Sequence, residues 1–153
     1  MKHRIRLRRE VPAARLARPL TTAARAALSQ ARAPRGEMTI VLTDSRRMRR
    51  LNARFAGQDH VTDVLAFPSA ASDPRGGPRY FGDVVIALPR ARLQARRRGV
   101  PLPQEVSLLA VHGTLHLLGL DHDRPASRRR MWRLQAAVLR HLGLDPEQLE
   151  VAP

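Results

Sequence analysis

Three histidines stand close together between residues 112 and 122. His112 and His116 are four residues apart, a spacing that puts two side chains on the same face of a helix. Gly119 can take the left-handed conformation that ends a helix and reverses the chain, which would bring His122 to the same point. Three imidazoles with an open fourth position are typical of a catalytic zinc site, where a zinc-bound water ionises near neutral pH and acts as nucleophile. The alternative, histidines that are merely packed or solvated, explains a single histidine better than three at this spacing.

The spacing matches the extended zinc-protease signature H-E-x-x-H-x-x-G-x-x-H at all positions but one. Gly113 stands where these proteases have the glutamate that acts as general base. Without that carboxylate, peptide hydrolysis loses a contribution of roughly 10²- to 10⁴-fold. The pattern therefore favours a metal site and opposes a metallopeptidase, which stays as a distant alternative.

The histidine segment also matches the signature H-G-x-L-H-L-x-G-x-D-H, and the sequence thereby resembles the YbeY family of single-strand-specific endoribonucleases. Two further blocks agree in the same order. The first is Leu51-Asn52 with Asp59, followed by Thr62-Asp63-Val64-Leu65, Phe67 and Pro68; the second is residues 81–86. The resemblance covers roughly residues 38 to 143.

This resemblance implies a mixed sheet of about four strands with surrounding helices, and one zinc ion held by His112, His116 and His122. It also implies activity on ribosomal RNA, including maturation of the 3′ end of the small-subunit 16S rRNA, and a role in ribosome quality control. The expected partners are therefore ribosomal RNA and the small subunit of the ribosome.

The chain departs from the family's pattern at Ala56, where the family usually has an arginine thought to help at the active site, and at Ala66, which replaces a common serine. Arg54, or another arginine of the same predicted helix, is a candidate for the missing charge; the alternative is that these arginines form a solvated face. The departure at Ala56 motivates a second hypothesis, a metal-stabilised RNA-binding protein of the ribosome without catalytic activity.

Two carboxylates are candidates for a supporting role at the metal. Asp121 is placed to orient a ligand histidine, as carboxylates commonly do, or to cap the turn beside Gly119. Asp83 follows a glycine at the start of a predicted strand and is either a similar orienting group or a turn residue.

The 153 residues include 28 Lys plus Arg against 13 Asp plus Glu, which gives a formal charge of +15. A basic excess favours a polyanionic partner, because neutralised phosphates release counterions. Codon bias explains the preference for arginine over lysine but not the shortage of acids. Residues 102–122 contain no Lys or Arg, so we expect an RNA track in the flanking elements that leads to the metal. The predicted RNA contacts are Arg54, Arg96, Arg97 and Arg98, with stacking of bases on Tyr80 or Phe81.

The absence of cysteine excludes disulfides, thiolate zinc sites, iron-sulfur clusters and a cysteine nucleophile. No apolar run approaches the ~20 residues of a membrane helix, and the N-terminal residues lack the apolar stretch of a secretory signal. We therefore expect a cytoplasmic protein without a membrane partner; its oligomeric state is not predicted.

Hydrophobic patterning predicts the elements that must position these residues. The predicted strands cover residues 4–9, 38–42, 61–67 and 82–88, and the predicted helices cover residues 11–32, a segment that begins after Asp44 and ends at Gly57, 91–98, 104–118 and 126–142. The expected class is α/β or α+β: a single domain over residues 1–153, with a mixed sheet covered by helices and a buried, zincin-like metal helix at 104–118.

Overall fold

The computed structural model of the chain describes residues 3–13, 15–56, 62–69, 77–120 and 124–149. Its strands are β1 (His3–Arg9), β2 (Gly36–Thr43), β3 (Val64–Pro68) and β4 (Arg79–Ala87). Its helices are α1 (Ala17–Gln30), α2 (Ser45–Ala56), α3 (Leu88–Arg98), α4 (Leu102–Leu117) and α5 (Pro125–His141). The strands form one mixed sheet in the order β1-β2-β4-β3, in which β1 and β4 run parallel to β2 and β3 runs antiparallel to β4. The predicted α+β class with a four-stranded mixed sheet is confirmed.

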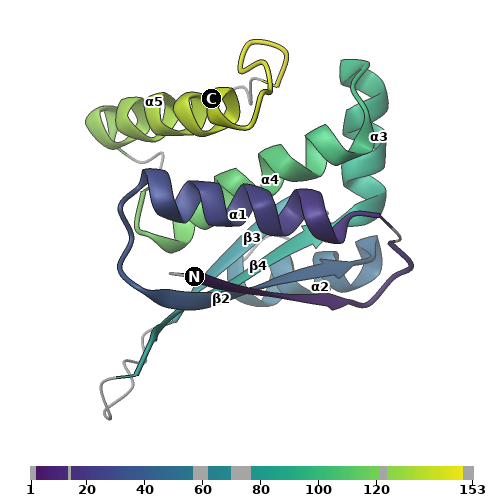
Figure 1. The fold of residues 1–153 in the computed structure, drawn as a ribbon. Helices are drawn as coiled ribbons and strands as arrows, with labels where there is room; N and C mark the ends of the chain where they lie inside the picture. Colours follow the sequence, from purple (N-terminus) through teal and green to yellow (C-terminus); the bar gives the residue numbers. More distant parts are fainter. Residues whose placement is uncertain (1–2, 14, 57–61, 70–76, 121–123, 150–153) are drawn as a thin grey trace.

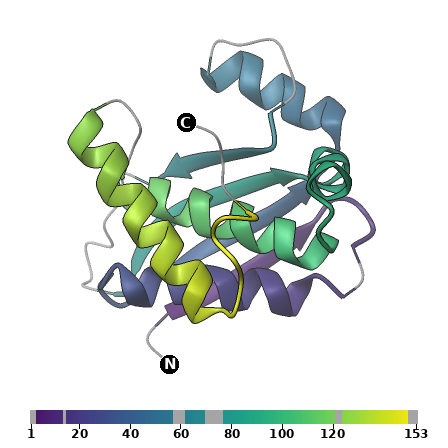
Figure 2. The same ribbon diagram turned by 90° about the horizontal axis from the view of Figure 1, so that it is seen from above.

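The sheet buries its two faces against different helices (Figure 1). Along β2, Met38, Ile40 and Leu42 join the main core with α1 and α4. Val41 points to the other face, where it packs with Met48 of α2. This alternation follows from the two-residue period of a strand. Helix α5 packs on α1 and α4 on their side away from the sheet, as Figure 2 shows from above.

Helix ends follow local chemistry. The backbone N–H of Arg47 donates to Oδ1 of Asp44 at 2.8 Å, which confirms Asp44 as the cap of α2. Helix α1 begins at Ala17 instead of residue 11. Its third residue is Pro19, which has no N–H to donate and is therefore tolerated only in the first turn. The first strand and the last three helices agree with the predicted ranges to within three residues.

No helix in the described part of the chain has both the length and the apolar character needed to cross a membrane.

Candidate active site

Helix α4 lies directly on the sheet, and a glycine makes this close approach possible. A Cβ atom added to Gly113 would lie 2.5 Å from Cγ1 of Val84 and 3.2 Å from Cγ2 of Val64. Real Cβ atoms do not approach other carbon atoms as closely as 2.5 Å. Gly113, the residue that departs from the protease signature, is therefore the one that lets α4 contact β4 and β3.

The two histidines of α4 point their Nε2 atoms at each other. Nε2 of His112 and Nε2 of His116 are 3.2 Å apart. Two nitrogens on one tetrahedral zinc ion, each about 2.0–2.1 Å from it, are separated by roughly 3.3 Å. The two imidazoles are thus already at the spacing of neighbouring metal ligands, as their four-residue separation in the sequence predicted.

A glutamine of α5 fixes the protonation of one of these rings. Nδ1 of His112 lies 2.9 Å from Oε1 of Gln135, and both residues are buried. An amide oxygen only accepts, so Nδ1 carries the hydrogen and Nε2 keeps its lone pair for an ion. Sequence reasoning missed Gln135. The signal that could have found it is a polar residue on the otherwise apolar buried face of α5, beside Met131, Val138 and Leu139.

The histidines line a cleft of about 370 Å³ between α4 and the edge strand β3. We call it the histidine cleft. Its lining residues are His112, Gly113, His116, Thr62, Asp63, Val64, Leu65, Ala66 and Pro68. Asp63 is the one acidic residue among them, and no role beyond its place in the family motif was predicted for it. The cleft therefore combines two nitrogen donors and a carboxylate residue beside an exposed sheet edge.

The end of α4 reverses as the sequence predicts. Gly119 has φ +90°, its N–H donates to the carbonyl of His116 at 3.0 Å, and the N–H of Leu120 donates to the carbonyl of Leu115 at 3.2 Å. These two bonds form the Schellman motif, which favours glycine because of its left-handed residue. Asp121 and His122 lie outside the described residues. Within the described ranges no group of three His, Cys, Asp or Glu side chains gathers as a metal site, so the structure brings together two of the three predicted ligands.

Asp83 is not near the histidines, and the prediction that it orients a ligand is wrong. Val84 faces α4, so the neighbouring residue points to the opposite face of the sheet, where Asp83 lines a pocket with residues of α2. There the hydroxyl of Tyr80 donates to Asp83 and lies 2.8 Å from Oγ1 of Thr39. Burial, followed by the hydrogen bond to Asp83, raises the pKa of Tyr80.

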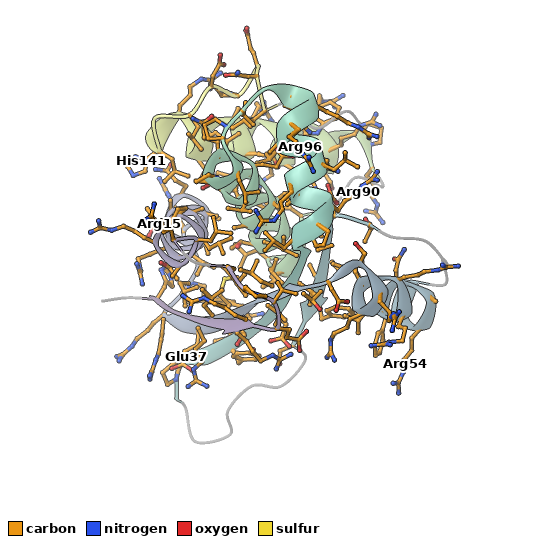
Figure 3. The ribbon with its side chains drawn as sticks, turned by 90° about the vertical axis from the view of Figure 1, so that its right-hand side faces the viewer. Arg15, Glu37, Arg54, Arg90, Arg96 and His141 are labelled. Atoms are coloured by element: carbon orange, nitrogen blue, oxygen red, sulfur yellow. The ribbon has the colours of Figure 1, made fainter. Side chains whose placement is uncertain are left out.

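The other predicted RNA contacts are dispersed over the molecule. Arg54 lies on the outer side of α2, with its guanidinium 5.3 Å from the ring centre of Phe55 (Figure 3). Arg96 and Arg97 are exposed at the end of α3, whereas Nε of Arg98 donates to the buried Glu105 at 3.2 Å. None of these four arginines lines the histidine cleft, and their contact with RNA stays a prediction.

The two aromatic candidates for base stacking are constrained by the fold. Phe81 is buried, with 3% of its surface exposed, beneath Gly36, so it cannot stack on a base. Tyr80 is half-buried and is held by Thr39 and Asp83. Phe55, by contrast, is 59% exposed.

Comparison with known proteins gives a consistent assignment. The family described as Endoribonuclease YbeY matches residues 4–143. Endoribonuclease YbeY of Myxococcus xanthus is 44% identical over 137 residues, which are 88% of this chain and 46% of that protein. The protein of the same name from an Anaeromyxobacter species is 43% identical over 141 residues, 92% of this chain and 72% of the relative. That of Gloeobacter violaceus is 48% identical over 121 residues, 76% of this chain and 62% of the relative.

The chain thus spans about half to about seven-tenths of the length of these relatives. Its fold is similar to the solution structure of a protein from Thermotoga maritima, with a TM-score of 0.56 and 22% identity over 91% of both chains. That likeness concerns the fold alone. The match over nearly the whole chain and the identity to several relatives show that this chain belongs to the YbeY endoribonuclease family.

Proposed function

We propose that this protein is a zinc-dependent endoribonuclease that cuts single-stranded RNA in the histidine cleft. The observation that carries the proposal is the pair of Nε2 atoms 3.2 Å apart, with Gln135 holding the tautomer of His112 that leaves Nε2 free to ligate. Two neutral imidazoles in this arrangement fit a zinc ion. Family membership supports the choice of RNA as the substrate.

His112 and His116 would hold the ion, together with His122 as the third predicted ligand. When bound there, zinc polarises a phosphate oxygen and lowers the pKa of a coordinated water. Residues of the chain supply the rest. Gln135 orients His112, the edge of β3 forms the opposite wall, and Asp63 is the candidate to accept a proton during attack on phosphorus.

The absence of Lys and Arg from residues 102–122 supports the same assignment. A cation beside a zinc-binding imidazole would disfavour the doubly charged ion. RNA must then be held by basic residues of other elements, next to the metal instead of around it.

The finer role is inferred from the resemblance to the family. We infer that the substrate is ribosomal RNA, that the reaction includes maturation of the 3′ end of 16S rRNA on the small subunit, and that the protein takes part in ribosome quality control in the cytoplasm. The printed names of the relatives support only the endoribonuclease activity.

The metallopeptidase alternative is opposed by the packing at Gly113. A glutamate at this position would drive its Cβ into Val84 and Val64. The chain therefore has no room for the general base of that enzyme class where the signature requires it.

One assay tests the three hypotheses. Zinc-loaded protein is incubated with a single-stranded rRNA precursor and with casein, each with and without a chelator. RNA cleavage that the chelator stops supports the proposed function. RNA binding without cleavage would establish the non-catalytic alternative, and loss of casein would establish the peptidase.

A matched pair of variants assigns the activity to the site. His116→Ala should remove both bound zinc and RNA cleavage. His141→Ala, at the exposed end of α5 (Figure 3), should leave both unchanged. Cleavage that persists in metal-free His116→Ala protein would refute the assignment.

A further inference from the structure

A second and larger cleft, of about 880 Å³, opens beside the last turn of α4. Its walls come from the turn after α1, from the first residue of β4 and from one face of α5. Leu118, Gly119 and Leu120 form the part contributed by the end of α4. His116 lines the histidine cleft and Leu118 lines the larger one, so the two clefts flank the same helix end.

The larger cleft is strongly basic. Its lining contains four arginines and no acidic residue; the arginines are Arg32, Arg79, Arg130 and Arg133. We call it the arginine cleft. Within the described part of the chain none of the four makes an ion pair. Arg79 is held at 5.7 Å over the ring of the buried Phe81, so at least one of these guanidinium groups is fixed by packing.

This concentration of charge works against the stability of the folded protein. Like charges that face one concave surface repel each other, and the low-dielectric walls of a cleft strengthen the field. Arg130 and Arg133 also lie three residues apart on α5, a spacing at which like charges destabilise a helix. A local arrangement that costs stability without a visible compensation indicates a functional surface.

The other residues that line the arginine cleft restrict which ligands it can bind. Ala31, Leu118, Leu120, Leu134 and Ala137 give the cleft an apolar part between the arginines. A ligand that fits has several negative charges, spaced so that separate guanidinium groups reach them, and apolar surface between the charges. Single-stranded RNA has this composition, because its phosphates alternate with sugars and unstacked bases.

Helix α5 connects the arginine cleft directly to the histidines. Arg133 and Leu134 line the arginine cleft, and the next residue, Gln135, accepts the hydrogen bond from His112. Arg130 and Arg133 are three residues apart and therefore lie on one face of α5, about one turn apart. A strand of RNA in the arginine cleft would lie against the end of α4, whose His116 lines the histidine cleft.

We propose that the arginine cleft binds the phosphodiester backbone of single-stranded RNA and leads it to the histidine cleft. Arg130 and Arg133 are the central contacts, and Arg32 and Arg79 close the other side. This inference rests on the proposed function for its choice of RNA. It assigns the RNA track to α5 and the α1–β2 turn, instead of the end of α3 where the sequence predicted it.

The test compares two double variants of the full chain that remove the same charge from the same helix. Arg130→Gln with Arg133→Gln alters the arginine cleft. Arg129→Gln with Arg140→Gln is the control, because both side chains are exposed and neither lines the cleft. Fluorescence anisotropy measures binding of labelled oligouridylate of about 20 nucleotides, longer than the usual site of one binding module. A chelator is present, so no cleavage occurs.

The expected result is a specific loss of electrostatic affinity. Each phosphate contact on a single strand contributes about 0.7 to the slope of log K against log salt, so the cleft variant should lower the slope by about 1.4. At about 0.1 M KCl this corresponds to an affinity lower on the order of tenfold. The control pair should change both quantities much less. Equal effects of the two pairs, or no effect of either, would overturn the proposal.

Two further readouts separate the possible failures. The melting temperature of the cleft variant should be equal to or higher than that of the wild type. Such a result would show that the variant binds RNA less tightly although it is still folded.

Polyglutamate is the competitor that tests ligand specificity. If it displaces RNA at equal charge concentration and its binding depends on the same two arginines, the site takes anionic chains in general and the RNA assignment is wrong. Because binding is measured without metal, a protein that never cleaves RNA would refute the proposed function and leave the cleft result standing.

Discussion

The atoms that orient a ligand matter at this site as much as the atoms that would bind the metal. His112 and His116 owe their proximity to helix geometry, which needs no outside partner. The direction of the His112 proton, in contrast, depends on Gln135 in another helix, 2.9 Å away. Such partners of metal-binding histidines set the tautomer and the basicity of the ring.

Gln135→Leu should therefore weaken zinc binding by about 10- to 100-fold, the range typical for removal of a partner of a ligand histidine. Leucine keeps the bulk of the side chain but accepts no hydrogen bond. Gln135→Glu is the matched variant, because a carboxylate still accepts from Nδ1, and it should retain affinity. Competition with a chelating dye measures both. Equal zinc affinity of the Leu variant and the wild type would contradict the role given to Gln135.

Glu105 is a second residue whose chemistry depends on its surroundings. It is fully buried, its Oε1 accepts from Arg98 at 3.2 Å, and its Oε2 has no hydrogen-bond partner among the described residues. Burial raises the pKa of this carboxyl above its ordinary 4.5, and Arg98 opposes the rise only in part.

The raised pKa gives a defined dependence of stability on pH. The folded state holds the proton of Glu105 more tightly than the unfolded chain, so this stabilisation is fully present below about pH 4.5 and is lost as pH rises through the folded pKa. Relative to Glu105→Gln, the wild type should therefore become less stable as pH rises above about 4.5 and through the raised pKa of the folded state. Urea unfolding at each pH gives the free energy of unfolding of both proteins. In the difference between the two values, the titration of all other groups cancels. A constant difference, or one that favours the wild type as pH rises, would contradict this account.

At the level of elements, the contact between α4 and the sheet decides where the histidines lie. Gly113 removes the one side chain that would separate the helix from Val84 and Val64. The helix is otherwise buried on nearly all sides, so a shift at this contact moves the histidines relative to β3.

Gly113→Ala should destabilise the protein by about 1–3 kcal/mol, the usual cost of an overpacked core, although alanine favours a helix more than glycine does. Val84→Ala, which removes the methyl 2.5 Å from the new Cβ, should relieve the clash. The double variant should thus be more stable than the sum of the two single effects predicts. Denaturant unfolding of the four proteins measures this coupling, and strictly additive effects would show that the close approach is not limiting.

The elements themselves were largely predictable, because each depends on a local pattern. The helix cap at Asp44 and the reversal at Gly119 follow from residue types within a few positions. The start of α1 was placed too early, since its apolar spacing extends past the point where Pro19 restricts the helix. The face of Asp83 was not predictable. Val84, Val85, Ile86 and Ala87 are all apolar, so alternation alone did not tell which face α4 covers.

At the site, too, the features that depend on local sequence were predictable and those that depend on tertiary contacts were not. The spacing of His112 and His116 is a local property and placed both correctly. Gln135 is 23 residues from its partner, and the four arginines of the arginine cleft come from three separate parts of the chain. Such arrangements depend on how α5 docks on α4 and α1, which no local pattern specifies.

At the scale of the whole molecule, the charge of +15 acts on the folded state as well as on partners. Net charge of one sign destabilises a compact protein by self-repulsion, and salt screens that repulsion. Surface ion pairs among the described residues, such as Arg6 with Glu37 at 3.4 Å, contribute little stability.

The melting temperature should therefore rise between about 0.05 and about 0.3 M KCl, by about 2–4 °C for each kcal/mol of repulsion removed in a chain of this size. Calorimetry at a fixed pH measures the change. RNA binding should weaken over the same range. A melting temperature that falls with KCl would show that attractive charge pairs outweigh the repulsion.

The strand order affects the sequence of events when the chain is synthesised. Domains form in the order in which their residues leave the ribosome, and β1, α1 and β2 emerge first. One edge of β2 then has no neighbour until β4, at Arg79–Ala87, has been made. An open strand edge invites pairing with other chains. The register of this edge is irregular only on the β4 side, where Phe81 is an extra residue opposite Glu37 and Met38, so β2 itself presents a regular ladder until β4 pairs with it. Pairing with β4 thus closes this edge before the helix that carries the histidines, α4, has been made.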